Sequence, residues 1–295
     1  VFFNSLIEDF DNSDALEILR IDHLGSVNAG PIEHDLKSVE IYLSNKLKDT
    51  CYEFLIPSIH MFCTSEDVNN LAYKLMIKNA FEDLIIPSVE SVSLLLNSLS
   101  VRFNNSPLMG RTHVQPASLT TFGKFFHSFN YRIEKYIQKI TDSVDNLKGK
   151  CNGAVGNYNS FYVAYPDLDW LGYSVFLTES LGLKTELITD QRGSFDDICE
   201  LIFYCQSLMS VYKDLSVDVI LQASYGNIKL EKVDSHVGSS VMPHKVNPWF
   251  FEVCEGNCKK FAWFSSGFVN ELQVSRLQRD LSDHDFERSY GELFG

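Results

Sequence analysis

The segment "FGKFFHSFNYRIEKYIQKITDSVDNL" (residues 122–147) carries the clearest structural pattern in the chain. Its apolar side chains recur every three or four residues, as one face of an α-helix requires: Phe122, Phe125, Phe126, Phe129, Ile133, Tyr136, Ile137, Ile140, Val144 and Leu147. The pattern continues for about seven turns, which predicts one long amphipathic helix.

Four other segments repeat this helical spacing: from Asp35, over 65–103, over 196–225, and from about Trp249 to Phe268. Pro87 should kink or divide the second of these helices, because proline lacks an amide N–H and its ring clashes with the preceding turn. Residues 1–33 are weakly patterned, "DHLGSVNAGPIEHD" (22–35) reads as loop, and "NNSPLMGRTHVQPAS" (104–118) is expected to form a turn and loop.

Long helices joined by short polar loops predict an all-α protein, an elongated bundle. The apolar stripes are rich in phenylalanine and wider than two contacting helices need. We therefore expect an oligomer, in which the surplus apolar surface meets another subunit. The alternative, in which the stripes only fill an intrachain core, stays open.

Composition excludes several classes of protein. The chain has 295 residues, 45% of them hydrophobic, and a net charge of −14. That charge argues against a nucleic-acid-binding surface but not against a small anionic substrate, because a local cation cluster can override it. No run of about 18 apolar residues is present, so no membrane span is expected. The start lacks the basic region of a secretory signal, and it lacks methionine, which indicates a fragment or a processed chain.

The cysteines predict reduced thiols in a cytosol-like compartment. There are seven, scattered, with no CxxC pair. Cys254 and Cys258 are four residues apart and could share a helix face, but no spaced histidines accompany them. A metal site is therefore not favoured there.

Three polar segments interrupt the helices: "EHDLKSVE" with His34 and Asp35, "GRTHVQPA" with His113, and "GSSVMPHKVNP" (238–248). In the last, Lys245 offers a cation and Asn247 an amide donor, both suited to a carboxylate. His113 is a candidate acid near neutral pH. Each has a plainer alternative: a helix N-cap for His34 and Asp35, a loop hydrogen bond for His113, a solvated charge for Lys245, and a turn for Ser239 and Ser240.

The last segment closely resembles the signature loop of the fumarase/aspartase superfamily, Gly-Ser-Ser-x-Met-Pro-x-Lys-x-Asn. Within it the chain is most similar to the adenylosuccinate lyases, particularly their bacterial-type branch. The matching segments run in the family's order from about residue 33 to the end: "HDLKSVEIYL" (34–43), "FCTSEDVNNL" (62–71), "RTHVQPASLTTFGK" (111–124), "NGAVGNYN" (152–159) and "VSRLQRDLSD" (274–283).

The resemblance implies an all-helical cytoplasmic homotetramer, with central helices bundled together and each active site built from three subunits. The implied reaction is β-elimination of fumarate from adenylosuccinate, giving AMP, and from succinylaminoimidazole carboxamide ribotide in purine synthesis. It implies no metal or organic cofactor. It also implies an incomplete N-terminal helical region over 1–103, a central bundle domain over 104–295, and a C-terminal domain beyond Gly295.

Residue roles follow from the same resemblance. Ser239 matches the general base and His113 the general acid that protonates the departing nitrogen. Lys245 and Asn247 match the carboxylate-binding pair, and Arg279 and Arg288 match groups near the nucleotide phosphate. The whole substrate-binding set is His34, Asp35, Thr64, Ser65, Gln191, Ser240, Lys245, Val246, Asn247, Arg279, His284 and Arg288.

The chain also departs from the family's pattern. Glu33 replaces Asn or Arg, Val253 replaces a binding Asn, and His284 replaces a serine. The family's N-terminal Arg-Tyr segment is not found. These departures bear on nucleotide affinity more than on elimination chemistry. Two alternatives remain: another lyase of the superfamily, acting on argininosuccinate or malate, and a non-catalytic, crystallin-like structural protein.

Overall fold

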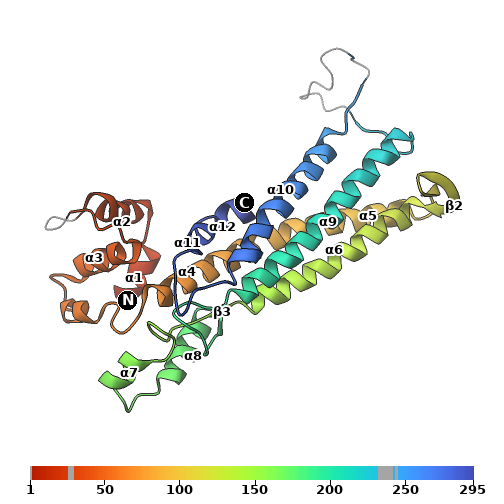
Figure 1. The fold of residues 1–295 in the computed structure, drawn as a ribbon. Helices are drawn as coiled ribbons and strands as arrows, with labels where there is room; N and C mark the ends of the chain where they lie inside the picture. Colours follow the sequence, from red (N-terminus) through yellow and green to blue (C-terminus); the bar gives the residue numbers. More distant parts are fainter. Residues whose placement is uncertain (1, 26–29, 232–241, 243–244) are drawn as a thin grey trace.

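The computed structural model describes residues 2–25, 30–231, 242 and 245–295, and α-helices dominate these ranges (Figure 1). The predicted all-α class is confirmed. The helices are α1 Phe2–Glu8, α2 Asn12–Leu24, α3 Asp35–Leu47, α4 Ser65–Ala80, α5 Ile86–Arg102, α6 Phe122–Asp145, α7 Asn159–Ala164, α8 Trp170–Ser180, α9 Asp196–Ser224, α10 Trp249–Glu271, α11 His284–Glu287 and α12 Tyr290–Phe294. A 3₁₀ turn covers Glu53–Ser58 and a π turn Phe81–Ile85.

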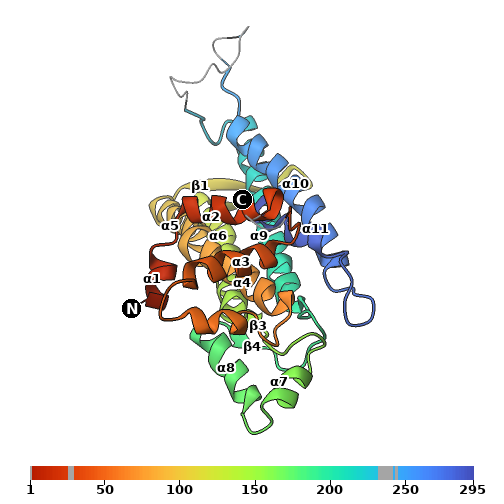
Figure 2. The same cartoon turned by 90° about the vertical axis from the view of Figure 1, so that its left-hand side faces the viewer.

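The long helices α5, α6, α9 and α10 lie side by side in an elongated bundle (Figure 1). The apolar stripe of α6 faces its interior, with Ile133 fully buried and Ile140 2% exposed. Side chains of α9, such as Leu201 and Ile202, are fully buried in the same core. Helices α2 and α3 pack on each other near the start of α4, whereas α7 and α8 project beyond that end (Figure 2).

Pro87 interrupts the hydrogen-bond ladder without breaking the helix. The helical stretch Ser65–Arg102 is continuous over 38 residues. Just before Pro87, the amide of Ile86 donates to the carbonyl of Phe81, five residues back, in a π turn. Such turns absorb a local mismatch in the ladder. The expected interruption therefore takes the form of a π turn between α4 and α5.

The helical stretch Ser65–Arg102 also differs from the expectation that the chain contains no segment able to span a membrane. By length and composition it is the one helix in the described ranges that could cross a membrane. Core helices of soluble proteins pass the same test, so one such helix is weak evidence. Several apolar side chains on it are exposed, including Leu84, Leu94 and Val101.

Residues 107–121 form an antiparallel hairpin, so the expectation of a simple turn and loop was wrong. Strand β1 (Pro107–Thr112) pairs with β2 (Gln115–Thr121), with a bulge between Met109 and Arg111. The connecting residues, His113 and Val114, both have positive φ, 52° and 65°. A short parallel pair, β3 (Lys148–Gly149) and β4 (Lys184–Thr185), joins two loops at the other end.

Two helices occupy the weakly patterned N-terminal region. The second, α2, begins at an Asp11 cap whose carboxylate accepts from the amides of Ser13 and Asp14. Helix α2 extends to Leu24, so the first part of the loop expected over 22–35 is helical. Capping by Asp11, rather than an apolar stripe, defines this helix.

Candidate active site

The start of α4 is held by a single buried carboxylate. Asp67, 1% exposed, accepts hydrogen bonds from the amides of Thr64 (2.8 Å) and Asn152 (2.9 Å). It also forms an ion pair with the Lys150 ammonium group at 2.8 Å, and that side chain is fully buried. The predicted binding residues Thr64 and Ser65 therefore sit on a fixed helix N-terminus.

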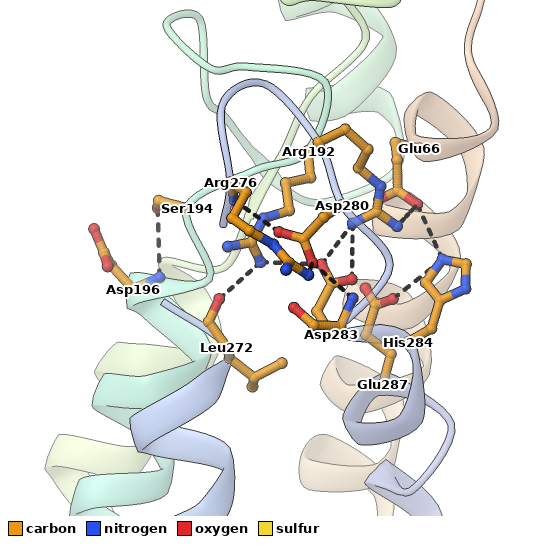
Figure 3. A network of polar contacts seen from close by, with 12 residues as sticks. Glu66, Arg192, Ser194, Asp196, Leu272, Arg276, Asp280, Asp283, His284 and Glu287 are labelled. Atoms are coloured by element: carbon orange, nitrogen blue, oxygen red, sulfur yellow. Dashed lines mark hydrogen bonds and ion pairs between the residues drawn. The ribbon is translucent and has the colours of Figure 1, made fainter. Parts of the chain in front are cut away.

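Arg279 links this helix start to the loop before α11. Its guanidinium donates to both carboxylate oxygens of Asp283, at 2.8 and 2.6 Å, and to Glu66 Oε1 at 3.0 Å. Arg192 donates to Asp283 at 3.0 Å and to the Leu272 carbonyl at 2.7 Å. Figure 3 shows Glu66, Arg192, Asp283 and His284 converging from three segments of the chain.

Five predicted binding residues lie on the segments of this network. Thr64 and Ser65 precede Glu66, and Gln191 precedes Arg192. The Gln191 amide donates to the Gln278 carbonyl at 3.2 Å, next to Arg279. His284 lies with Nε2 3.7 Å from Glu66 Oε1. Thr64, Ser65, Gln191, Arg279 and His284 are thus gathered within one chain.

Glu287 gives this network an unusual charge state. Burial, together with the neighbouring carboxylates of Glu66 and Asp283, raises the pKa of Glu287 to about 8. Within the described ranges, Glu66 Oε2 and Glu287 Oε1 are buried without a hydrogen-bond partner. Near neutral pH Glu287 is therefore mostly protonated, which limits the negative charge beside Arg279.

The ligand atoms of Glu66, His284 and Glu287 lie within 4.8 Å of one another, a spacing that a metal ion could bridge. However, Arg279 already supplies positive charge to Glu66. Glu287 also holds a proton that a metal would have to displace. The contacts therefore fit a hydrogen-bonded ion-pair network better than a metal centre.

Arg288 follows Glu287 of this network, whereas the side-chain contacts of His34 are made within the start of α3. His34 caps α3, with Nδ1 accepting from the Lys37 amide at 3.3 Å, and both His34 and Asp35 are exposed. Burial raises the pKa of Tyr73, and the carboxylates of Glu287 and Asp35 add to that rise, which places Asp35 within electrostatic range of the network. Arg288 and Tyr73 both line a cavity of about 450 Å³.

His113 lies at the opposite end of the bundle. The 38-residue stretch from Ser65 to Arg102 spans about 57 Å at the rise of an α-helix, and the hairpin follows its far end (Figure 1). His113 is exposed at the hairpin tip. The adjacent Arg111 donates to the Val114 carbonyl at 3.3 Å and stacks on Tyr225, 4.2 Å from the ring centre, at the end of α9.

The described part of the signature loop lies at the same end as the hairpin. Lys245, Val246 and Asn247 lie just before Pro248, the N-cap of α10, and Lys245 is exposed. The Lys245 amide donates to the Met242 carbonyl at 3.0 Å. Ser239 and Ser240 lie outside the described residues. One chain thus gathers Thr64, Ser65, Gln191, Arg279 and His284 at one end and places His113 and Lys245 toward the other.

Sequence reasoning missed the buried charges that build the network. These residues are Glu66, Asp67, Lys150, Arg192, Asp283 and Glu287. Some signal was present: Thr64-x-x-Asp67 has the spacing of a capping box, and Arg279-x-x-x-Asp283 has the spacing of a local ion pair. No local pattern predicts that Lys150, far along the chain, meets Asp67.

Known proteins resemble the chain in sequence and in fold. The family described as "Lyase" matches residues 38–262. The chain is 36% identical to the adenylosuccinate lyase of Buchnera aphidicola subsp. Schizaphis graminum, covering 100% of this chain and 63% of that protein. It is 34% identical to the adenylosuccinate lyase of Escherichia coli K12, with the same shares of both chains.

The fold comparison agrees with the sequence comparison. The crystal structure of a fumarate lyase from Mesorhizobium sp. BNC1 has a TM-score of 0.71 at 17% identity, covering 98% of this chain and 64% of that one. This chain spans about 63% of the length of its curated relatives. The family match over most of the chain, together with the shared helical fold and the signature-loop motif, identifies the chain as a member of the lyase family of the fumarase/aspartase superfamily.

Proposed function

We propose that the whole protein is a cytoplasmic adenylosuccinate lyase of purine biosynthesis. It would eliminate fumarate from adenylosuccinate, giving AMP, and from succinylaminoimidazole carboxamide ribotide. The observation that carries this proposal is the match, over essentially the whole chain, to relatives named adenylosuccinate lyase at 34–36% identity.

The elimination requires a base and an acid on either side of the scissile C–N bond. In the proposal, Ser239 removes a proton from the carbon beside a carboxylate, with Ser240 next to it. Lys245 and Asn247, with Val246 between them, bind that carboxylate and stabilise its doubly charged aci form. His113 then protonates the departing nitrogen, a role that suits an imidazole near neutral pH.

The network around Arg279 is proposed to receive the nucleotide phosphate. Arginine binds phosphate well through paired donors, and Arg288 lines the cavity beside the network. His284 would donate to phosphate when protonated, in place of the family's serine. Because Arg279 is bound to Asp283 and Glu66, phosphate would share its donors with these carboxylates.

A homotetramer with shared sites would reunite the groups that one chain holds apart. The β1–β2 hairpin that carries His113 and the start of α4, which the Arg279 network holds, lie at opposite ends of the bundle (Figure 1). Neighbouring chains would therefore have to supply the missing part. Exposed apolar side chains on the α4–α5 helix favour such packing: Leu94 and Val101, seven residues apart on one face, are 70% and 72% exposed.

Fumarate release from purified full-length protein tests this proposal. Adenylosuccinate should support release, whereas argininosuccinate should not. Ser239→Ala should reduce turnover by roughly 10³-fold or more, because the reaction loses its base, while the unfolding transition changes little. Activity only on argininosuccinate, or fumarate–malate interconversion alone, would favour another lyase of the superfamily. No activity in the folded parent would favour the crystallin-like alternative.

A further inference from the structure

We propose that Cys63 and Cys151 form a reversible disulfide under oxidising conditions, with Cys63 reacting first. Both are free thiols in the structure. Each lies directly before a residue whose amide is bound by the buried Asp67 carboxylate at the start of α4. The existence of this modification site does not depend on the proposed lyase activity.

The Asp67 carboxylate brings the two cysteine backbones together. It accepts from the amide of Thr64 at 2.8 Å and from the amide of Asn152 at 2.9 Å. Each amide belongs to the residue directly after a cysteine. A disulfide needs Cα atoms within about 7 Å of each other, and the binding of both segments to one carboxylate brings the two backbones close together.

The side chains of Cys63 and Cys151 are also close to each other. The thiols of Cys63 and Cys151 hydrogen-bond to each other. The segments on which they lie are fixed on several sides: the Ser174 hydroxyl donates to the Cys151 carbonyl, and a Cβ built at Gly153 would lie 3.5 Å from the Phe62 carbonyl oxygen. The two thiols are therefore neighbours on segments that these contacts fix in place.

The pair is chemically unequal. The hydrogen bond from Cys151 holds the pKa of Cys63 below its usual value despite burial, while the same hydrogen bond and burial raise the pKa of Cys151. Cys63 is half-buried, whereas Cys151 is only 5% exposed. Elsewhere burial raises the pKa of Cys205 to about 12. Cys63 is thus the more reactive thiol of the pair and the one a reagent can reach.

The reaction balances with a small disulfide such as glutathione disulfide as oxidant. The Cys63 thiolate attacks one sulfur of glutathione disulfide and releases one glutathione thiolate, leaving a mixed disulfide at Cys63. Cys151 then gives up its proton to solvent and attacks the Cys63 sulfur, releasing the second glutathione. The two cysteines lose two electrons and the oxidant gains them. The product ties the turn before Thr64 to the segment before Gly153.

Peptide mapping of the wild-type protein tests the proposal without any substitution. Purified protein is incubated with glutathione at a series of reduced-to-oxidised ratios, quenched, alkylated, digested and analysed by mass spectrometry. We expect a linked pair of peptides containing Cys63 and Cys151, which dithiothreitol separates. Exposed Cys51 reports that the oxidant reacted. If Cys63 and Cys151 both remain alkylated at ratios that modify Cys51, the proposal is overturned.

Two variants test the order of reaction and the pairing. Cys151→Ser should trap glutathione on Cys63, because the resolving thiol is gone; an unmodified Cys63 in that variant would contradict its role. Cys254→Ser is the matched control, since Cys254 hydrogen-bonds to Cys258 in the other neighbouring pair of thiols. It should leave the Cys63–Cys151 linkage unchanged, and loss of the linkage in this control would count against the assignment.

Discussion

At the residue scale, a few buried charges position the candidate binding residues. Lys150 and Asp67 are almost fully buried and bind each other. Asp67 also accepts the amides that fix Thr64 and Asn152. A buried ion pair of this kind contributes little by itself, but removing one partner leaves the other charge without compensation.

Asp67→Asn should therefore destabilise the fold strongly. The change leaves the Lys150 ammonium buried without its counter-charge, and we expect the free energy of unfolding to fall by about 3–5 kcal/mol. Chemical denaturation measures this loss. Glu17→Gln is the control, because Glu17 pairs with Arg20 on the surface and should leave the unfolding midpoint unchanged. Equal losses in both variants would contradict the role of Asp67.

Glu287 predicts a pH-dependent stability. Its pKa is about 8 in the folded state against an ordinary value of 4.5, so the folded state binds more protons between these values. Its contribution to stability is complete below about pH 4.5 and is lost as the pH rises through 8.

Glu287→Gln should remove this dependence, because glutamine is neutral at every pH. Denaturation at pH 5 and pH 9 compares the two proteins. We expect similar stability at pH 5 and a more stable variant at pH 9, by at most about 5 kcal/mol. A difference that stays the same at both pH values would show that Glu287 does not titrate as described.

The sequence predicted which polar segments carry the candidate residues, but not the buried contacts that hold those segments in place. The motif "FCTSEDVNNL" located Thr64 and Ser65, and "VSRLQRDLSD" located Arg279. The sequence could not predict that Lys150 contacts Asp67 or that Arg279 contacts Glu66. Those contacts join segments far apart in the sequence, and periodicity reports only which face of a helix is buried.

At the scale of elements, the long helices were predictable and the hairpin was not. The apolar spacing of 122–147 corresponds to α6, whose stripe is buried as expected. The hairpin gave no signal because its turn residues are His113 and Val114 rather than Asn-Gly. Strands β1 and β2 are also largely exposed, so no alternation of apolar and polar side chains marks them.

The backbone of Val114 is strained in that turn. A β-branched residue is disfavoured at a φ of 65°, so Val114→Gly should raise the free energy of unfolding by about 1 kcal/mol. Leu119→Gly in β2 is the control and should lower it, because glycine weakens a strand. Thermal unfolding of both variants provides the comparison; destabilisation by Val114→Gly would contradict the strain.

At the scale of the whole molecule, the length of the bundle determines which candidate residues one chain can bring together. The start of α4, where Arg279 pairs with Glu66, lies at one end, and the β1–β2 hairpin that carries His113 lies at the other (Figure 1). The exposed apolar residues Leu84, Leu94 and Val101 lie on the connecting helix. The proposed site shared between chains would reconcile this geometry with the proposed chemistry.

Mixing two inactive variants tests that arrangement most directly. His113→Ala and Arg279→Gln proteins are co-expressed with different tags, mixed oligomers are isolated with both tags, and fumarate release from adenylosuccinate is measured. If neighbouring chains supply the two groups, roughly a quarter of the sites in a random mixture regain both, and activity returns to that fraction of the parent value. Mixed oligomers with no more activity than either variant alone would contradict a site shared between chains.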